Sequence, residues 1–291
     1  MIKLICSDMD GTLVGNKHEI SKKNVNAIKG AQELGVEFLV VTGRSYNDTV
    51  RQLEDARICC KSLVMNGAEL RDSDGEILWS NYLEKDAIRK VIKILNDHEL
   101  YSELYTNKGN YTVCPPPLRK HSFAVRATHF FPNIDYADAY QKAEQNEIYS
   151  NVSYIENLDE FLDDDLLVGK IICFDDNVDL LDDLREKLPL ELGLEVSGSF
   201  LINLEVTNSG AQKGASIKRY SRNHGISLSE IMTIGDGLND LTMMDSDFGV
   251  TVAMGNGIEE LKQKAKFVTE TNTDDGVAKA IEKYLGGINK K

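Results

Sequence analysis

Short, mostly apolar runs that end abruptly in polar loops constrain the fold of this chain more than any other feature of its sequence. Residues 2–6, 36–41 and 231–234 form three such runs. Strands buried in a parallel sheet have this near-continuous apolar pattern, because helices cover both faces of the sheet. Ligands of such sheets bind beyond the carboxyl ends of the strands, so the polar residues after each run are candidate site residues.

Helical patterns alternate with these runs. Apolar residues recur at intervals of three and four over residues 21–34, and Gly35 ends that pattern. A second helix is expected over about 45–56 and a further strand over 63–65. Alternating strands and helices predict an α/β fold with a doubly wound, mainly parallel sheet.

The alternation stops after Asn66-Gly67 and resumes with a predicted helix at 213–223. Between these positions hairpin-like strands and helical segments mix, with a proline break at 115–117, which is typical of an α+β domain. We therefore predict a discontinuous core domain of residues 1–82 and 200–291. An inserted α+β domain of residues 83–199 would interrupt it.

The chain carries 33 Lys and Arg against 47 Asp and Glu, which gives a net charge of −14 and a pI near 4.9. This charge repels nucleic-acid backbones and anionic membranes, and no apolar run reaches the roughly 18 residues of a membrane span. We expect a soluble cytoplasmic protein, monomeric or weakly self-associating, without a nucleic-acid or membrane partner. Such an acidic protein needs a local cation, a metal or backbone N–H groups to bind a small anion.

Asp8 and Asp10 directly follow the first apolar run. Two carboxylates spaced by two residues can face one site, where one acts as nucleophile and the other donates or accepts a proton. A carboxylate that attacks a phosphate meets like-charge repulsion, which a divalent cation offsets. Oxygen ligands without His or Cys favour Mg²⁺ over zinc. A plain acidic turn is the alternative interpretation.

Thr42, Gly43 and Arg44 follow the second run. A hydroxyl beside a glycine N–H suits phosphoryl oxygens at the start of a helix, although a threonine N-cap is the alternative. Lys213 opens a predicted helix, where the helix dipole disfavours a cation. Its position therefore indicates an anion nearby, and an ordinary surface lysine is the alternative.

Asp236 and Asp240 lie in the Gly-containing loop after the run at 231–234. With the first acid pair they could complete an all-oxygen metal site, and the glycines let the loop approach it closely. A simple Asp/Gly turn is the alternative interpretation.

The histidines and two acidic runs fall outside these four places. We interpret the aspartate runs 163–165 and 182–183 as solvated helix faces or caps. The five histidines are interpreted as structural or surface groups: His18, His98, His121, His129 and His224.

Together the four loops resemble the four motifs of the haloacid dehalogenase (HAD) superfamily, and within it the Cof-type phosphatases with a C2B cap. The matching segments are residues 8–12, 42–44, 213–214 and 235–240. Residues 66–68, 252–256 and 275–277 also resemble stretches typical of the Cof-type group.

The resemblance implies a HAD-like Rossmannoid core, a cap that selects the alcohol half of the substrate, and a two-step phosphoryl transfer. Asp8 would form an aspartyl-phosphate, and Asp10 would protonate the leaving alcohol and then activate water. The remaining implied roles are phosphate or substrate binding by Thr42, Gly43, Arg44, Lys213 and Asn239, and Mg²⁺ binding by the Asp8 carboxylate, the Asp10 backbone carbonyl and Asp236, with Asp240 steadying these ligands.

On these grounds we predict a Mg²⁺-dependent phosphatase for small phosphate esters, sugar phosphates in particular. A phosphotransferase or phosphosugar mutase of the same superfamily would pass the phosphoryl group to a second hydroxyl instead. A receiver-type signalling domain also combines acidic residues, a Thr and a Lys, but its roughly 120 residues leave the insert unexplained. A non-catalytic phosphosugar sensor would not need the acid at Asp10.

Overall fold

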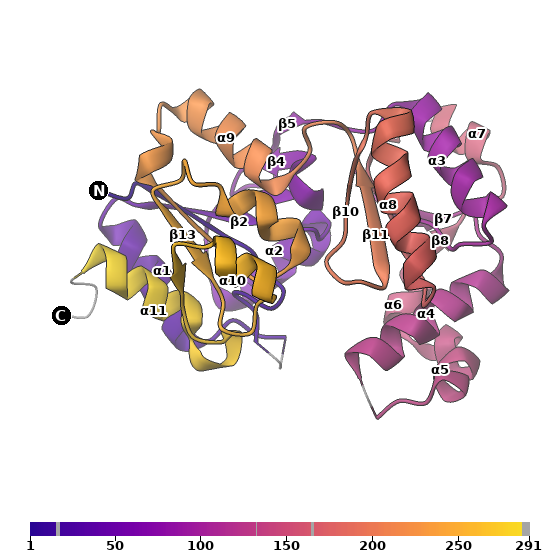
Figure 1. Cartoon of the computed structure of the whole chain (residues 1–291), viewed down its shortest axis with the longest axis horizontal. Helices are drawn as coiled ribbons and strands as arrows, with labels where there is room; N and C mark the ends of the chain where they lie inside the picture. Colours follow the sequence, from indigo (N-terminus) through magenta and orange to yellow (C-terminus); the bar gives the residue numbers. More distant parts are fainter. Residues whose placement is uncertain (16–17, 132, 164–165, 287–291) are drawn as a thin grey trace. The chain divides into compact units, whose positions relative to one another are not determined.

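The computed structural model describes residues 1–15, 18–131, 133–163 and 166–286. The chain divides into two compact units, of which unit 1 is Met1–Ser80 with Gly210–Lys291 and unit 2 is Asn81–Ser209 (Figure 1). Unit 2 extends beyond the boundary at 199 that the sequence suggested, because residues 203–207 form a strand of its sheet. It also begins at 81 rather than 83.

Unit 1 is built on an eight-stranded sheet in the order β14-β13-β12-β1-β2-β3-β4-β5. Neighbouring strands from β14 to β3 are parallel, and β3, β4 and β5 pair antiparallel, which confirms the mainly parallel α/β fold. The strands are β1 (Leu4–Ser7), β2 (Glu37–Val41), β3 (Lys61–Val64), β4 (Glu69–Arg71), β5 (Ile77–Ser80), β12 (Ile231–Gly235), β13 (Val250–Ala253) and β14 (Phe267–Val268).

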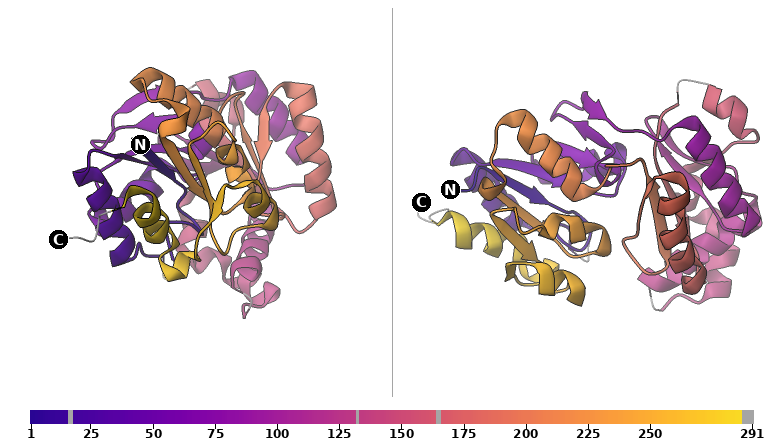
Figure 2. Two further views of the ribbon diagram at one scale, coloured as in Figure 1. Left: turned by 60° about the vertical axis from the view of Figure 1, so that its left-hand side comes forward. Right: turned by 45° about the horizontal axis from the view of Figure 1, so that its top comes forward.

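Helices cover both faces of this sheet (Figure 2). On β1, Ile5 belongs to an apolar cluster shared with three of the helices, whereas Leu4 and Cys6 belong to the cluster on the other face. A strand buried on both sides needs an uninterrupted apolar run, as the sequence indicated. The helices are α1 (Lys22–Glu33), α2 (Tyr46–Ala56), α9 (Lys213–His224), α10 (Glu259–Lys264) and α11 (Gly276–Leu285).

Local capping fixes where the first two helices begin. The side chains of Ser21 and Ser45 accept hydrogen bonds from the backbone N–H groups of Asn24 and Asp48, so both serines are N-caps. Residues 238–244, after β12, form the 3₁₀ helix η4 (Leu238–Met244).

Unit 2 has a six-stranded sheet in the order β10-β11-β9-β6-β7-β8, in which β7 and β8 are parallel and the other neighbours are antiparallel. On one face α3 and α8 pack through Ile88, Leu184 and other apolar residues. The strands are β6 (Glu103–Thr106), β7 (Gly109–Thr112), β8 (Val152–Tyr154), β9 (Val168–Phe174), β10 (Glu195–Ser197) and β11 (Asn203–Thr207), and the longer helices are α3 (Lys85–Asp97), α4 (Pro116–Phe130), α5 (Tyr136–Lys142) and α8 (Val178–Leu192).

Helix α4 was missed because the prolines at 115–117 were interpreted only as a break. They occupy the N-cap and the first helical positions, where a missing N–H costs little and the fixed φ favours the helix. Two short helices, α6 (Glu147–Ser150) and α7 (Leu158–Asp163), complete unit 2.

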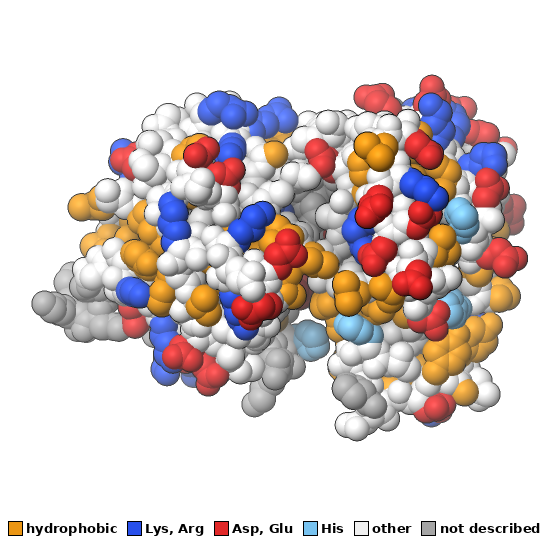
Figure 3. Space-filling view, in the orientation of Figure 1, with side chains coloured by type: hydrophobic (Ala, Val, Ile, Leu, Met, Phe, Trp, Pro, Cys, Tyr) orange, Lys and Arg blue, Asp and Glu red, His pale blue; other side chains and the backbone are white. Residues whose placement is uncertain are grey.

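Acidic side chains are scattered over the visible surface of unit 2 rather than gathered in one place (Figure 3). Asp182 and Asp183 lie on the exposed side of α8 and pair with Arg185 and Lys187, which confirms a solvated helix face. Asp163 is exposed at the end of α7, whereas Asp164 and Asp165 lie outside the described residues. Within the described chain, no helix is long and apolar enough to cross a membrane.

Candidate active site

The carboxyl ends of three neighbouring strands of unit 1 bring predicted site residues together. In the sheet order β12-β1-β2, Asp8 follows β1, Thr42 follows β2 and Asp236 follows β12. The backbone N–H of Asp8 donates to the carbonyl of Ile234 at 2.9 Å, which holds two of these strand ends side by side. The first, second and fourth loops therefore meet at one edge of the sheet.

Lys213, the first residue of α9, lies between two carboxylates. Its Nζ is 2.6 Å from Asp8 Oδ1 and 2.6 Å from Asp240 Oδ1, and the residue is only 1% exposed. Burial lowers the pKa of Lys213, but the two carboxylates outweigh burial and raise this pKa overall, so the amine stays charged. The interpretation of Lys213 as an ordinary surface lysine is wrong.

The loop after β12 is held by its own aspartates. Asp240 Oδ2 accepts hydrogen bonds from the N–H groups of Asp236 at 2.9 Å and Gly237 at 3.0 Å. Thr12 Oγ1 donates to Asp236 Oδ1 at 2.5 Å. At Gly11, where φ is +76°, a Cβ atom would lie 2.2 Å from Asp236 Oδ2, so this close approach requires glycine.

Asp8, Asp236 and Asp240 each offer a carboxylate oxygen within 4.8 Å of the others, and with Lys213 we call them the lysine cluster. Three carboxylates and one ammonium leave a formal charge of −3 + 1 = −2. Burial raises the pKa of Asp8 although Lys213 opposes it, and burial with Asp240 raises the pKa of Asp236 to about 7. A divalent cation that prefers oxygen ligands would neutralise this excess, so the donor set fits Mg²⁺.

Asp10 points to a different partner, Arg44. Arg44 Nε donates to Asp10 Oδ2 at 2.7 Å, and Arg44 Nη2 pairs with Asp10 Oδ1. Arg44 Nη1 also donates to Gln52 Oε1 at 3.0 Å, while the Asp10 side chain remains 54% exposed. A two-point contact of this kind orients the carboxylate.

Thr42 is buried, and its Oγ1 accepts a hydrogen bond from the N–H of Arg44 at 3.2 Å. Because Ser45 caps α2, the alternative interpretation of Thr42 as the N-cap is wrong. Gly43 lies between Thr42 and Arg44 in this turn. Asn239 Nδ2 donates to Asn66 Oδ1 at 3.3 Å, so the second and fourth loops border the segment after β3.

Reasoning from residue chemistry alone did not single out Asn66 or Asn256, which only the resemblance indicated. Asn256 Nδ2 donates to the Gly11 carbonyl at 2.8 Å. Met65, Asn66 and Gly67 follow β3 with φ of +51°, +58° and +94°. Strained backbone of this kind gathers at functional sites. The available signal was an Asn-Gly pair directly after an apolar run.

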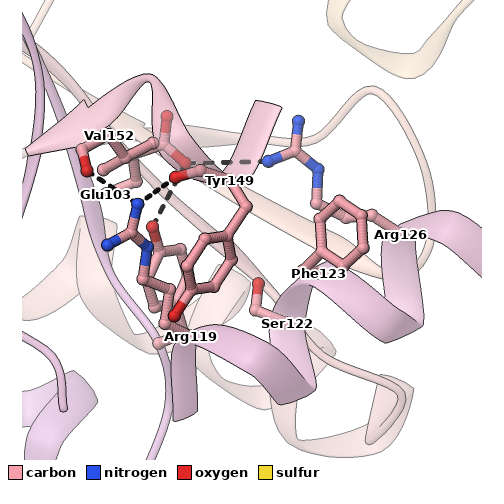
Figure 4. A pocket seen from close by; sticks show the side chains of 8 residues that line it. Glu103, Arg119, Ser122, Phe123, Arg126, Tyr149 and Val152 are labelled. Carbon is pink, nitrogen blue, oxygen red and sulfur yellow. Dashed lines mark hydrogen bonds and ion pairs between the residues drawn. The ribbon is translucent and has the colours of Figure 1, made fainter. Parts of the chain in front are cut away.

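Unit 2 contains a small polar pocket beside α4 (Figure 4). Arg119 contacts the carbonyls of Tyr149 and Val152, and Arg126 Nη1 lies 3.6 Å from Glu103 Oε2. Arg119 Nε and Ser122 Oγ are buried there and have no hydrogen-bond partner among the residues that the structure describes. The residues that line this pocket include a single carboxylate, so it does not rival the lysine cluster as a metal-dependent active site.

Comparisons with known proteins agree over nearly the whole chain. A model of the haloacid dehalogenase-like hydrolase family matches residues 5–281. Phosphatase YwpJ of Bacillus subtilis (strain 168) is 30% identical over 289 residues, which cover 98% of this chain and 100% of that protein. The 5-amino-6-(5-phospho-D-ribitylamino)uracil phosphatase YwtE of the same organism is 29% identical over 288 residues, covering 98% and 99%.

A solved structure gives the same result. It is a haloacid dehalogenase-like hydrolase from B. subtilis that matches with a TM-score of 0.84 and 30% identity, over 98% of this chain and 100% of that one. These matches confirm the resemblance seen in the four loops. This chain belongs to the haloacid dehalogenase-like hydrolases.

Proposed function

We propose that this protein is a Mg²⁺-dependent phosphatase that hydrolyses sugar phosphates through an aspartyl-phosphate on Asp8. As a HAD-like hydrolase with whole-chain relatives named phosphatases, it is a phosphoric monoester hydrolase that acts on small phosphorylated substrates. The observation that carries the finer proposal is the buried contact between Lys213 and Asp8. All the proposed site residues belong to unit 1, which supports assigning unit 1 as the catalytic domain and unit 2 as an inserted domain.

In the first step, Asp8 attacks the phosphorus atom. Lys213 binds Asp8 Oδ1, which leaves Oδ2 for the new O–P bond as the bond from phosphorus to the substrate oxygen breaks. Asp10 gives its proton to the departing alkoxide. The charged Lys213, the Thr42 hydroxyl, the Gly43 N–H and the Asn239 amide are the groups we assign to the phosphoryl oxygens.

In the second step, water attacks the aspartyl-phosphate. Asp10 accepts the proton of this water, inorganic phosphate leaves, and the Asp8 carboxylate is restored. The two-point contact with Arg44 holds the Asp10 carboxylate in one orientation for this step. We assign Arg44 to orienting Asp10 and to contact with the substrate.

A bound Mg²⁺ would neutralise charge on the transferring phosphoryl group. We assign the Asp8 and Asp236 carboxylates and the Asp10 backbone carbonyl to this ion. Both oxygens of Asp240 already accept hydrogen bonds, one from Lys213 and the other from two backbone N–H groups. Asp240 is therefore proposed to orient the loop and Lys213 around the metal ligands.

The support for a sugar phosphate as the substrate comes from one relative. The relative YwtE is named as a phosphatase of a phosphorylated ribityl compound, which is close in chemistry to a sugar phosphate. A panel of sugar phosphates, ribityl phosphates, nucleotides and cofactor phosphates would rank the substrates by phosphate release. Isomerised sugar phosphate instead of free phosphate would favour a mutase, and binding without turnover would favour a sensor.

The reaction is tested with Asp8→Asn and a matched surface variant, Asp183→Asn. We expect Asp8→Asn to lose phosphate release with every substrate, while Asp183→Asn keeps wild-type rates because its carboxylate lies on exposed α8. Chelator should abolish the wild-type rate and added Mg²⁺ should restore it. An active Asp8→Asn enzyme contradicts the nucleophile assignment, and full activity in chelator contradicts the metal role.

A further inference from the structure

A histidine and two aspartates converge in unit 2, at a place that the proposed phosphatase reaction does not use. His121 lies on α4, and Asp175 and Asp176 follow β9. His121 Nε2 is 3.1 Å from Asp175 Oδ2 and 3.8 Å from Asp176 Oδ1, and one ligand atom from each residue lies within 4.8 Å of the others. We call these three residues the histidine cluster.

The spacing of these atoms matches a small coordination shell. Zinc bonds to histidine nitrogen and carboxylate oxygen are about 2.0–2.1 Å long, so neighbouring ligand atoms of a tetrahedral site lie about 3.3–3.4 Å apart. The two measured separations from His121 Nε2, 3.1 and 3.8 Å, bracket this value. An ion between the three atoms therefore requires only small movements of side chains.

The charges of the histidine cluster are unbalanced. Among the described residues, neither Asp175 nor Asp176 has a Lys or Arg partner within 4.0 Å, and His121 is the basic side chain that lies within this distance of both. Asp175 is only 8% exposed, whereas the Asp176 side chain is 70% exposed, so Asp175 is the buried carboxylate of the pair. On the nearby α8, by contrast, Asp182 and Asp183 each pair with a cation. A divalent cation would supply the missing positive charge.

The surrounding groups already orient the ligand atoms. His121 Nδ1 lies 2.6 Å from the Tyr136 hydroxyl, and a Nδ1–H that donates to this oxygen leaves Nε2 with a free lone pair. Asp175 Oδ1 accepts the backbone N–H of Asn177 at 2.9 Å, which turns Oδ2 toward His121. Metal-binding histidines and carboxylates usually have such outer partners. Tyr136 comes from α5, which packs against α4 (Figure 1).

We propose that His121, Asp175 and Asp176 form a second metal site, selective for Zn²⁺ or a similar transition-metal ion rather than Mg²⁺. An imidazole ligand suits zinc, whereas Mg²⁺ is bound by oxygen ligands. Three protein ligands leave a fourth position for water or an added group. The ion would link α4 to the turn between β9 and α8, so its binding stabilises unit 2 independently of the phosphatase reaction.

The test uses the full-length protein freed of metal and then held in excess Mg²⁺, which competes for the oxygen ligands of the lysine cluster. Zinc binding is measured by calorimetry for wild type, His121→Asn, Asp176→Asn and His98→Asn. His98 is an exposed histidine at the end of α3 and serves as the matched control. Circular dichroism without zinc shows whether each variant is folded.

We expect one zinc equivalent in wild type and His98→Asn that is missing in His121→Asn, and at least a tenfold weaker affinity in Asp176→Asn. Zinc should also raise the melting temperature of wild type more than that of His121→Asn, and Mg²⁺-dependent activity should be equal in both. Equal zinc stoichiometry in wild type and both cluster variants would overturn the proposal, as would wild-type protein that binds no zinc in excess Mg²⁺. Either result would mean that His121 and Asp175 form an ordinary side-chain contact and not a metal site.

Discussion

The lysine cluster of unit 1 and the histidine cluster of unit 2 both gather carboxylates, but they balance the charge differently. In unit 1 a buried ammonium contacts two of three carboxylates at 2.6 Å, and the remaining charge of −2 matches a cation with oxygen ligands. In unit 2 an imidazole lies within 4.0 Å of two carboxylates that have no Lys or Arg partner among the described residues. Under the two proposals, the resident ammonium or imidazole group would decide which metal each cluster prefers.

Among the substitutions that test this difference, replacement of Lys213 should have the largest effect on stability and phosphate release. Lys213→Met keeps an unbranched side chain at this position but leaves Asp8 and Asp240 buried without the ammonium group that they contact. Breaking a buried ion pair by removal of one partner costs about 3–5 kcal/mol, so we expect the free energy of unfolding to fall by about this amount in chelator. Phosphate release should be lost. Urea denaturation with and without Mg²⁺ measures the stability change.

The control for this variant is Lys218→Met, five residues further along α9. Lys218 pairs with Asp245 at a half-exposed position, and we expect this substitution to leave phosphate release unchanged. If Lys213→Met were as stable and as active as Lys218→Met, the lysine would not organise the cluster.

Asp236→Asn should remove the pH dependence of stability that Asp236 contributes within the lysine cluster. Because the pKa of Asp236 is raised to about 7, its stabilising contribution in metal-free protein is present below pH about 4 and is lost as the pH rises through 7. The variant does not titrate there and keeps the bond from Thr12. At pH 8 in chelator we expect it to be more stable than wild type by on the order of 3 kcal/mol.

Mg²⁺ provides the control for this prediction. Saturating Mg²⁺ should stabilise wild type at pH 8 and stabilise Asp236→Asn much less, because the variant has lost a charged ligand. Denaturation curves at pH 4, 6 and 8 measure both effects. A metal-free wild type that gains stability relative to Asp236→Asn between pH 4 and 8 would contradict the sign.

The two clusters also differ in how much of each could be predicted from the sequence. In the lysine cluster, Asp8 and Asp236 each follow a strand and Lys213 begins a helix. Parallel strands gather their carboxyl ends at one edge, so Asp8 and Asp236 could be predicted as neighbours. The burial of Lys213 could not be predicted, since it depends on how α9 packs 205 residues after Asp8. The contact of Arg44 with Asp10 depends in the same way on side-chain placement.

No pattern in the sequence predicted the histidine cluster. His121 and Asp175 are 54 residues apart, and no spacing rule links a helix interior to the end of an antiparallel strand. The proline interpretation at 115–117 also concealed α4, the helix that carries His121. Without that helix, His121 was interpreted as a structural or surface group.

Tyr136→Phe should weaken zinc binding by the histidine cluster, an effect smaller than those of the two substitutions in the lysine cluster. The substitution removes the hydroxyl beside His121 Nδ1 and keeps the ring. Loss of such an outer partner typically weakens metal binding 10–100-fold, so we expect a weaker zinc affinity in this range without a change in stoichiometry. Tyr154→Phe, at an exposed tyrosine of β8, is the matched control. Equal affinity in the two variants would show that Tyr136 does not orient His121.

Asp183→Asn should have the smallest effect. It tests whether cation binding and stability depend on the number of acidic residues or on where they lie. Asp183 forms an ion pair with Lys187 one helical turn away, at 2.7 Å, with both side chains about half exposed. Water and salt screen such pairs, and holding two long side chains together costs conformational entropy. We expect no measurable change in the urea midpoint, in zinc stoichiometry or in the response to Mg²⁺. A clear loss in any of these would mean that the net charge of −14, and not the two clusters, governs cation binding by this chain.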